Sequence, residues 1–266
     1  MSHVRQPAVA GRFYPGAADV LATTVDGLLG TALQAGQPAT RMKLRGLIVP
    51  HAGYEYSGPV AASAYALLTQ PRAMSAAVVI LGPSHFEPLR DMAAAPHDAW
   101  RTPLGEVVLD AEVRRALVDG GASSSETPHR AEHSIEVQLP FIQRCLPDVP
   151  VLPVAVGGDS PRDWAELLAE VLPNDVLLVV STDLSHYRDA VTARRLDART
   201  AEAIEALDVD AIGPADACGV DALRVAMAWS RLRHHHVRRL DLRNSADTVG
   251  DPSRVVGYGA FAIIGS

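Results

Sequence analysis

Short runs of β-branched and other apolar residues alternate along the chain with longer stretches in which apolar residues recur at helical spacing. The apolar runs cover residues 44–50, 76–83, 149–156, 175–182 and 254–264. This alternation is typical of strands joined by crossover helices in a mostly parallel sheet. Because the runs are continuously hydrophobic, we expect helices to cover both faces of the sheet.

The helical stretches lie between these runs. Their spacing predicts helices over 57–69, 132–146, 161–172, 190–206 and 219–232. Ser57 is a capping candidate for the first helix, and Pro59 lies near its first turn. Pro140 should kink or split the second helix, because a proline inside a helix removes a backbone hydrogen bond. Residues 30–42 look like a surface loop. Without a repeat or a change of composition, residues 1–266 are expected to form a single α/β domain.

Composition and charge narrow the class of protein. A chain of 266 residues with 48% hydrophobic and 21% charged residues can bury a large core, which excludes disordered and fibrous proteins. The net charge of −7 offers no basic surface for a phosphate backbone, which argues against nucleic-acid partners. No apolar run reaches the roughly 18 residues of a membrane span, and the start MSHVRQPAVAG lacks a signal segment. We therefore expect a cytoplasmic protein that does not interact with membranes.

Three histidines follow predicted strands closely. His51, His85 and His186 each come within a few residues of the end of an apolar run, and Asp183 lies three residues before His186. In open α/β sheets, ligands bind outside the carboxyl ends of the strands. A single histidine there is commonly a structural polar residue, but three favour a shared function. Imidazole is both the commonest metal ligand and the commonest acid or base near neutral pH, so the sequence points to a metal site or a catalytic site.

A metal site needs a third ligand, for which Cys218, Asp183, Glu132 and His133 are candidates. Cys218 precedes a predicted helix start, where backbone donors and the helix dipole are expected to lower the pKa of a thiol and favour the metal-binding thiolate. The segment with Glu132 and His133 lacks the HExxH order of zinc proteases. The alternative for that segment is a polar helix face that lines the pocket.

The other cysteine, histidines and basic residues receive structural interpretations. Two cysteines are too few for a disulfide scaffold, and Cys145 is expected to be a buried, inert thiol. The basic run 231–239 contains His234 to His236 and suggests either a phosphate or nickel site or a solvated edge strand. We favour the strand, because consecutive side chains on a strand alternate faces. His97 and His129 are assigned no role.

Seven segments together resemble the Memo family, whose bacterial members are also called AmmeMemoRadiSam system protein B. In chain order they are RQPAVAGRFYP, VPHAGYEYSGPVAASAY, ILGPSHF, EHSIEVQLPF, VVSTDLSHY, DACG and GYGAFAI, and they span nearly the whole sequence. The Memo fold is similar to that of class III extradiol ring-cleavage dioxygenases, which are non-haem iron enzymes. The resemblance therefore implies an α/β sandwich around a mixed sheet.

The resemblance also implies roles for single residues. It implies that His51, His85 and Cys218 form the metal site, with Asp183 and His186 beside it, and His186 stands in a position similar to that of the acid/base histidine of the dioxygenases. Those enzymes use a carboxylate as the third ligand, and the cysteine here departs from that pattern. A thiolate ligand accepts iron, copper or zinc and is itself oxidisable, which leaves ring cleavage open.

The resemblance further places aromatic residues near the mouth of the pocket. Phe13 and Tyr14 stand at those positions, although a packing role is the alternative. Tyr54, Glu132 and His133 are likewise expected to line the pocket or bind substrate.

The sequence leaves three interpretations of function open. The first is a redox metalloenzyme that acts on an unknown small molecule or peptide, with iron held by the three ligands. In it His186, oriented by Asp183, shuttles protons as the catalytic pair. The alternative is a non-catalytic metal- or peptide-binding protein that acts with AMMECR-type and radical SAM partners. A hydrolytic zinc enzyme is a third interpretation, but it lacks a clear carboxylate base, for which Glu132 is the only nearby candidate.

Overall fold

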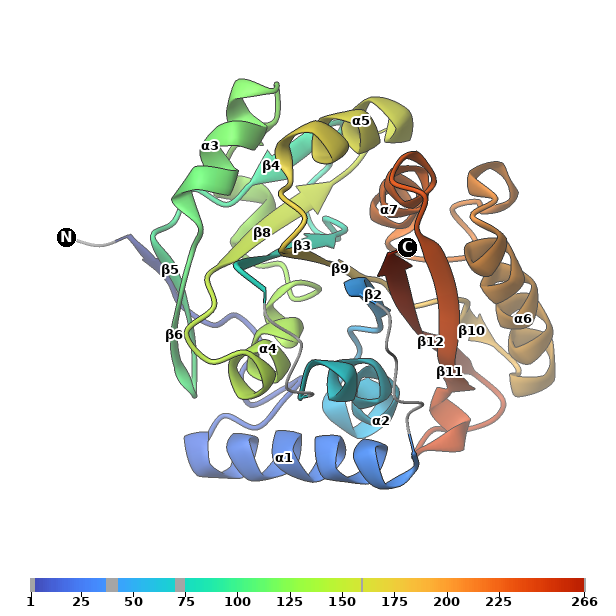
Figure 1. Ribbon diagram of the computed structural model, residues 1–266. Helices are drawn as coiled ribbons and strands as arrows, with labels where there is room; N and C mark the ends of the chain where they lie inside the picture. Colours follow the sequence, from blue (N-terminus) through green and yellow to red (C-terminus); the bar gives the residue numbers. More distant parts are fainter. Residues whose placement is uncertain (1–2, 37–42, 70–74, 159, 266) are drawn as a thin grey trace.

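A mixed sheet runs through the centre of the computed structural model, which describes residues 3–36, 43–69, 75–158 and 160–265 (Figure 1). From one edge to the other, its strands are β10 (His186–Arg188), β12 (Val255–Gly265), β2 (Lys43–Val49), β9 (Val176–Ser181), β3 (Ala77–Gly82), β8 (Val151–Val156), β4 (Met92–Ala94) and β7 (Ser123–Ser124). An additional strand, β11 (His236–Asn244), pairs with β12. The central strands β2, β9, β3 and β8 are parallel, whereas β12 joins β2 and β4 joins β8 in the antiparallel sense.

All five predicted strands are present, and the expected α/β fold with a mixed sheet is confirmed. The parallel pairings are those among the four central strands and that of β4 with β7. Every residue of β3, β8 and β9 is buried, because hydrophobic clusters pack on both faces of the sheet. One face carries α1 (Ala18–Gln34), α2 (Tyr54–Tyr65) and α4 (Leu139–Cys145), and the other carries α3 (Ala111–Asp119), α5 (Pro161–Val171), α6 (Ala190–Ala206) and α7 (Val220–Leu232) (Figure 1). A small second sheet contains β1 (Val4–Arg5), β5 (Ala99–Thr102) and β6 (Gly105–Val108).

Three of the predicted helices match the structure to within a residue or so, namely α5, α6 and α7. The helix predicted from 57 begins earlier, at Tyr54, after the N-cap residue Gly53. Ser57 therefore does not cap it. Its hydroxyl lies inside the helix and donates to the carbonyl oxygen of Ala52 at 2.9 Å. The helix ends in a 3₁₀ turn, η1 (Ala66–Thr69).

The prediction of a helix over 132–146 is wrong for its first half. Only Leu139–Cys145 is α-helical, and a 3₁₀ turn, η3 (Glu136–Gln138), precedes it. Pro140 lies in the first turn of α4, where its missing N–H breaks no helical hydrogen bond. The proline therefore lies at the start of a helix and, contrary to the expectation, does not kink or split one.

Two further predictions need correction. Residues 30–34 are the end of α1, which the sequence pattern did not reveal, and residues 37–42 of the predicted loop lie outside the described residues. The basic run does enter an edge strand, but that strand begins only at His236. His235 is buried, and its ring lies 4.8 Å from that of Trp229.

The remaining short 3₁₀ turns are η2 (Thr127–His129), η4 (Val209–Ala211) and η5 (Ser245–Asp247). Within the described ranges, no helix combines the length and the apolar character that crossing a membrane requires.

Candidate metal centre

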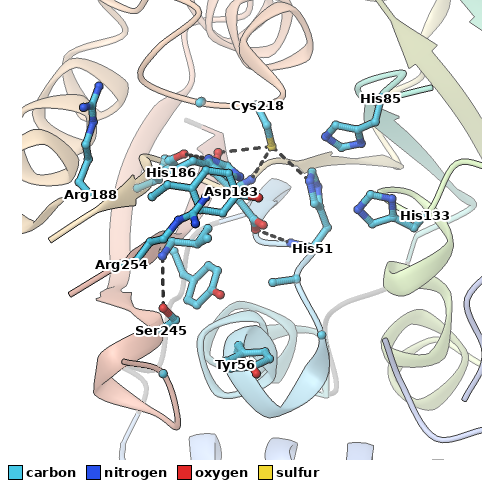
Figure 2. Close-up of a pocket in the computed structure, with 18 of the residues that line it drawn as sticks. His51, Tyr56, His85, His133, Asp183, His186, Arg188, Cys218, Ser245 and Arg254 are labelled. Atoms are coloured by element: carbon cyan, nitrogen blue, oxygen red, sulfur yellow. Dashed lines mark hydrogen bonds between the residues drawn. The ribbon is translucent and has the colours of Figure 1, made fainter. Parts of the chain in front are cut away.

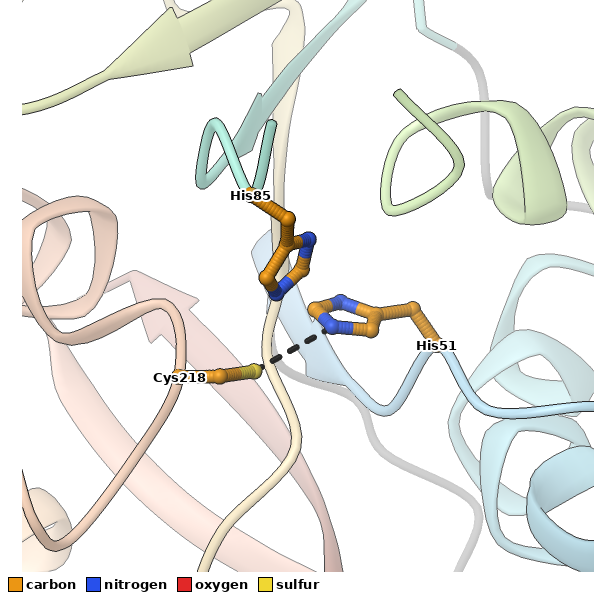
Figure 3. A group of neighbouring side chains, drawn as sticks. All are labelled: His51, His85 and Cys218. Atoms are coloured by element: carbon orange, nitrogen blue, oxygen red, sulfur yellow. Dashed lines mark hydrogen bonds between the residues drawn. The ribbon is translucent and has the colours of Figure 1, made fainter. Parts of the chain in front are cut away.

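Three potential metal ligands meet beyond the carboxyl ends of the central strands. His51 follows β2, His85 follows β3, and Cys218 precedes α7 (Figure 3). β3 and β2 both pair in parallel with β9, so the carboxyl ends of these strands open onto one edge of the sheet. One ligand atom from each residue lies within 4.8 Å of the other two. Cys218 Sγ is 3.2 Å from His51 Nε2.

A buried hydrogen-bond network fixes which nitrogen of His51 faces the thiol. The Ser181 hydroxyl donates its one proton to the carbonyl oxygen of Ser134 at 2.6 Å, and its oxygen accepts from Gln138 Nε2 at 2.8 Å. His51 Nδ1 lies 3.0 Å from the same oxygen, so the ring nitrogen must be the donor. The lone pair of Nε2 therefore points toward Cys218, in the form that binds a metal.

A carboxylate orients His85 in the same sense. Glu132 Oε1 lies 2.9 Å from His85 Nδ1, and Oε2 accepts from the His85 backbone N–H at 2.6 Å. Burial raises the pKa of Glu132, but the hydrogen bonds and charge of His85 outweigh it and hold this pKa at about 2. The ionised carboxylate can only accept, so Nδ1 of His85 must be the donor, and in the neutral ring that binds a metal the lone pair is on Nε2. Glu132 thus positions a ligand from behind the centre.

The electrostatics of the centre favour neutral groups. Burial lowers the pKa of His51 well below its usual value, and the neighbouring His133 and His85 lower it further. Burial, with the Asp183 carboxylate, raises the pKa of Cys218 to about 12. The expected lowering of this pKa is wrong, because desolvation outweighs the backbone donors near the helix start. A coordinated cation reverses this balance by stabilising the thiolate.

Asp183 and His186 lie beside the three ligands, but the carboxylate is not hydrogen-bonded to the His186 ring. His186 Nδ1 is 2.7 Å from the Leu184 carbonyl oxygen, which fixes the proton on that nitrogen. Asp183 Oδ1 accepts from the His51 backbone N–H at 2.8 Å. Burial raises the pKa of Asp183 to about 6, against the lowering effect of that hydrogen bond. The carbonyl of Leu184, not Asp183, therefore orients His186.

The ligands form part of the wall of a cavity of about 970 Å³, which is large enough for a small molecule (Figure 2). Seven residues selected from the sequence line it, namely Phe13, His51, His85, His133, Asp183, His186 and Cys218. The ring of His133 lies 4.9 Å from that of His85 and 4.5 Å from that of Phe13.

Three residues expected in the pocket do not line this cavity. The Tyr54 hydroxyl donates to the carbonyl oxygen of Val137 at 2.6 Å, and that of Tyr14 donates to Glu136 at 2.6 Å. Both rings are buried in the core and serve packing. Glu132 is 1% exposed and lies behind His85.

Several lining residues were not found from the sequence, namely Tyr56, Tyr187, Arg188, Arg254 and Tyr258. Tyr56 stands two residues after Tyr54, and both lie in the first turn of α2. Had the helix been predicted to begin at Tyr54, the two rings would have been expected on different sides of it, one buried and one in the pocket. The sequence pattern does not predict that residues 186–188 lie next to residues 254–258. Their contact arises from the antiparallel pairing of β10 with β12.

Comparison with known proteins connects this chain to one family. The model of the family described as "Memo-like protein" matches residues 5–262. A "MEMO1 family protein" of Aquifex aeolicus is 35% identical over 275 residues, covering 96% of this chain and 97% of the relative. "MEMO1 family protein MK0963" of Methanopyrus kandleri is 36% identical over 277 residues, covering 97% and 98%.

A solved structure shows the same kind of fold. The crystal structure of the uncharacterized protein JW3007 from Escherichia coli K12 superposes with a TM-score of 0.51 at 14% sequence identity. The match covers 82% of this chain and 99% of that protein. At this identity the likeness concerns the fold alone.

Proposed function

The chain belongs to the Memo family, and from that premise we propose that it is a metalloprotein with redox activity in the cavity beside His51, His85 and Cys218. The convergence of three donor atoms within 4.8 Å carries the proposal. Both histidines also have their Nδ1 atoms engaged by fixed partners, which leaves both Nε2 lone pairs for a ligand.

The donor set fits a divalent transition metal. Two imidazole nitrogens and one sulfur suit iron, copper or zinc, and three protein ligands leave open positions for other molecules. We propose iron as the native metal, which when bound would supply electron-transfer chemistry toward oxygen and a substrate. The cysteines are unpaired, as expected for a protein of the reducing cytoplasm, where we place this activity.

The residues around the ligands position a substrate and move protons. His186 Nδ1 donates its proton to the carbonyl oxygen of Leu184. Its Nε2 atom is therefore available to accept a proton from a substrate in the cavity. Phe13 and His133 form an aromatic contact in the cavity wall on the ligand side, against which a substrate ring can pack. The buried Asp183 anchors the His51 backbone and so fixes the loop that carries the first ligand.

Metal analysis tests the binding part of the proposal. Protein purified without oxygen should contain iron by elemental analysis, and His51→Ala should lose it. An unchanged metal content in this variant would overturn the assignment of the centre. The redox part requires oxygen consumption by the iron-loaded protein with catechols or other reductants. No turnover above a Cys218→Ala control would disprove it.

One observation favours a second candidate function. The dioxygenases that the Memo fold resembles use a carboxylate where this chain presents Cys218, so the cavity can hold a metal or a peptide without turnover. In that case the chain acts as a binding component beside AMMECR-type and radical SAM proteins. Tight metal retention without oxygen consumption, together with co-purification of such a partner, would support this alternative.

A further inference from the structure

The cavity extends from the metal centre to two arginines. Arg188 and Arg254 line it together with His51 and Cys218. In Figure 2, both lie on the opposite side from His85 and His133. Neither guanidinium has an ion-pair partner among the residues that the structure describes. Because neither arginine is paired with a carboxylate of the protein, both can bind an anionic ligand in the cavity.

The irregular edge strand brings three consecutive residues to the lining of this cavity. In a regular strand, neighbouring side chains point to opposite faces of the sheet. Here His186, Tyr187 and Arg188 all line the cavity. The pairing of β10 with β12 is irregular between His186 and Arg188, and Tyr187 has a φ of 59°. A bulge of this kind re-aims side chains, and it is common beside functional sites.

The exposed ring of Tyr187 orders one of the two arginines. Tyr187 is 63% exposed, and the Arg254 guanidinium carbon lies 4.4 Å from the centre of its ring. Stacking on an aromatic face holds a guanidinium without using its N–H donors. Those donors stay free to bind an oxygen ligand.

The side chains on this side of the cavity carry a net positive charge. Asp251 also lines it, and its Oδ1 atom accepts from the Ser253 backbone N–H at 2.8 Å. Two arginines thus face a single solvent-exposed carboxylate, while the other carboxylate of the lining, Asp183, is buried beside the ligands. An apolar stretch formed by Leu184, Ala217 and Val256 lies in the same lining.

We propose that this end of the cavity is a subsite for an anionic oxygen group, a carboxylate or a phosphate, of a small-molecule substrate. The inference rests on the proposed function, because the other end of the substrate then lies at the metal centre. Arginine binds both groups through paired N–H donors, and its fixed charge favours them over a neutral amide. Arg188 and Arg254 are the residues that select for this group.

Binding of three simple probes tests the subsite. Benzoate, phenyl phosphate and benzamide share one ring and differ in the charge of their substituent. The metal-loaded protein is titrated with each probe by calorimetry or NMR. Whichever of benzoate and phenyl phosphate binds more tightly should have an affinity at least about tenfold higher than that of benzamide. The double variant Arg188→Gln/Arg254→Gln should reduce this preference to near unity. The double variant Arg162→Gln/Arg195→Gln removes the same two charges at exposed positions of α5 and α6 outside the cavity and should preserve it. The stronger of the two anions identifies the substrate group.

The metal-free protein separates this proposal from the metal site. After chelation, the preference for the anion should remain and should still depend on the two arginines. If the preference disappears with the metal but survives the double arginine variant, the anion binds the metal and the subsite is wrong. Equal binding of charged and neutral probes, or no binding of either anion, also overturns it. A failure of the metal proposal would appear instead as absent metal in the elemental analysis, with the anion preference intact.

Discussion

Cys218 Sγ lies 3.2 Å from His51 Nε2, although 167 positions separate the two residues in the chain. The contact joins the loop after β2 to the segment before α7. The loop of Asp183, which follows β9, lies between them: its carboxylate accepts from the His51 backbone, and its own backbone N–H is 3.3 Å from the thiol sulfur. Hydrogen bonds of three loops therefore hold the two donor atoms together, so the thiol should be part of any metal centre here.

We expect Cys218→Ser to lower the affinity for a divalent metal by at least about 100-fold, because a serine hydroxyl is a harder and weaker ligand than a thiolate. Titration with cobalt(II) measures this affinity and also shows the thiolate-to-cobalt absorption band, which the variant should lack. Cys145→Ser is the matched control, since this partly buried thiol contacts the carbonyl oxygen of Tyr65 at 3.6 Å and lies outside the cavity. A cobalt band that persists in the Cys218 variant would contradict the prediction.

Ser181→Ala should weaken metal binding without removing a ligand. The hydroxyl of Ser181 accepts from His51 Nδ1, so the variant loses the contact that fixes the ring orientation and tautomer. The expected loss of affinity is about 10-fold to 100-fold, measured by competition with a chelator of known affinity. Ser63→Ala removes another buried hydroxyl that donates to a backbone carbonyl, at Val60, far from the ligands. Equal effects of the two substitutions would show that the Ser181 contact has only a structural role.

The central sheet and the three strand-end histidines could be predicted from the sequence for one physical reason. Fully buried parallel strands are continuously apolar, and the residue that follows each strand lies at the ligand edge. His51 and His85 needed no knowledge of distant contacts. Cys218 was selected from its place before a helix, but the direction of its pKa was wrong because burial is not visible in local sequence.

The other misses also involve long-range contacts. Tyr14 was placed at the pocket mouth, yet it donates to Glu136, which lies more than a hundred residues away in sequence. Arg254 reaches the cavity only because β12 pairs with β10. The bulge at Tyr187 results from that pairing, and its neighbours carry no glycine that would announce a positive φ. Such features depend on the assembled sheet, and no local pattern encodes them.

Glu136→Gln should strongly destabilise the fold, because this buried carboxylate anchors the N-terminal segment. It accepts from Arg5 Nη1 at 2.6 Å, from the backbone of Ala8 and Val9, and from the Tyr14 hydroxyl. Removing its charge leaves the buried guanidinium of Arg5 uncompensated, with an expected loss of about 3–5 kcal/mol in the free energy of unfolding. Urea denaturation measures this loss.

The matched control for this substitution is Glu106→Gln, which neutralises a solvent-exposed carboxylate paired with Arg101. Its free energy of unfolding should fall by no more than about 1 kcal/mol, because exposed ion pairs contribute little. Similar losses in the two variants would contradict the assigned role of Glu136.

Stability should fall at mildly acidic pH because His129 is buried as a neutral ring. Its Nε2 atom lies 3.0 Å from the Ala93 carbonyl oxygen, Nδ1 has no partner among the described residues, and burial lowers its pKa to about 3. Between that value and the unfolded value near 6.5, the unfolded chain binds the extra proton, so stability rises with pH. The contribution of His129 to the free energy of unfolding is fully present above about pH 6.5 and decreases by about 2 kcal/mol on going to pH 5. Because burial also lowers the pKa of His51, urea denaturation should show a larger total loss between the two pH values. His129→Gln, which can still donate to Ala93, should reduce that loss by about 2 kcal/mol. An unchanged pH dependence in the variant would show that other groups account for the acid sensitivity.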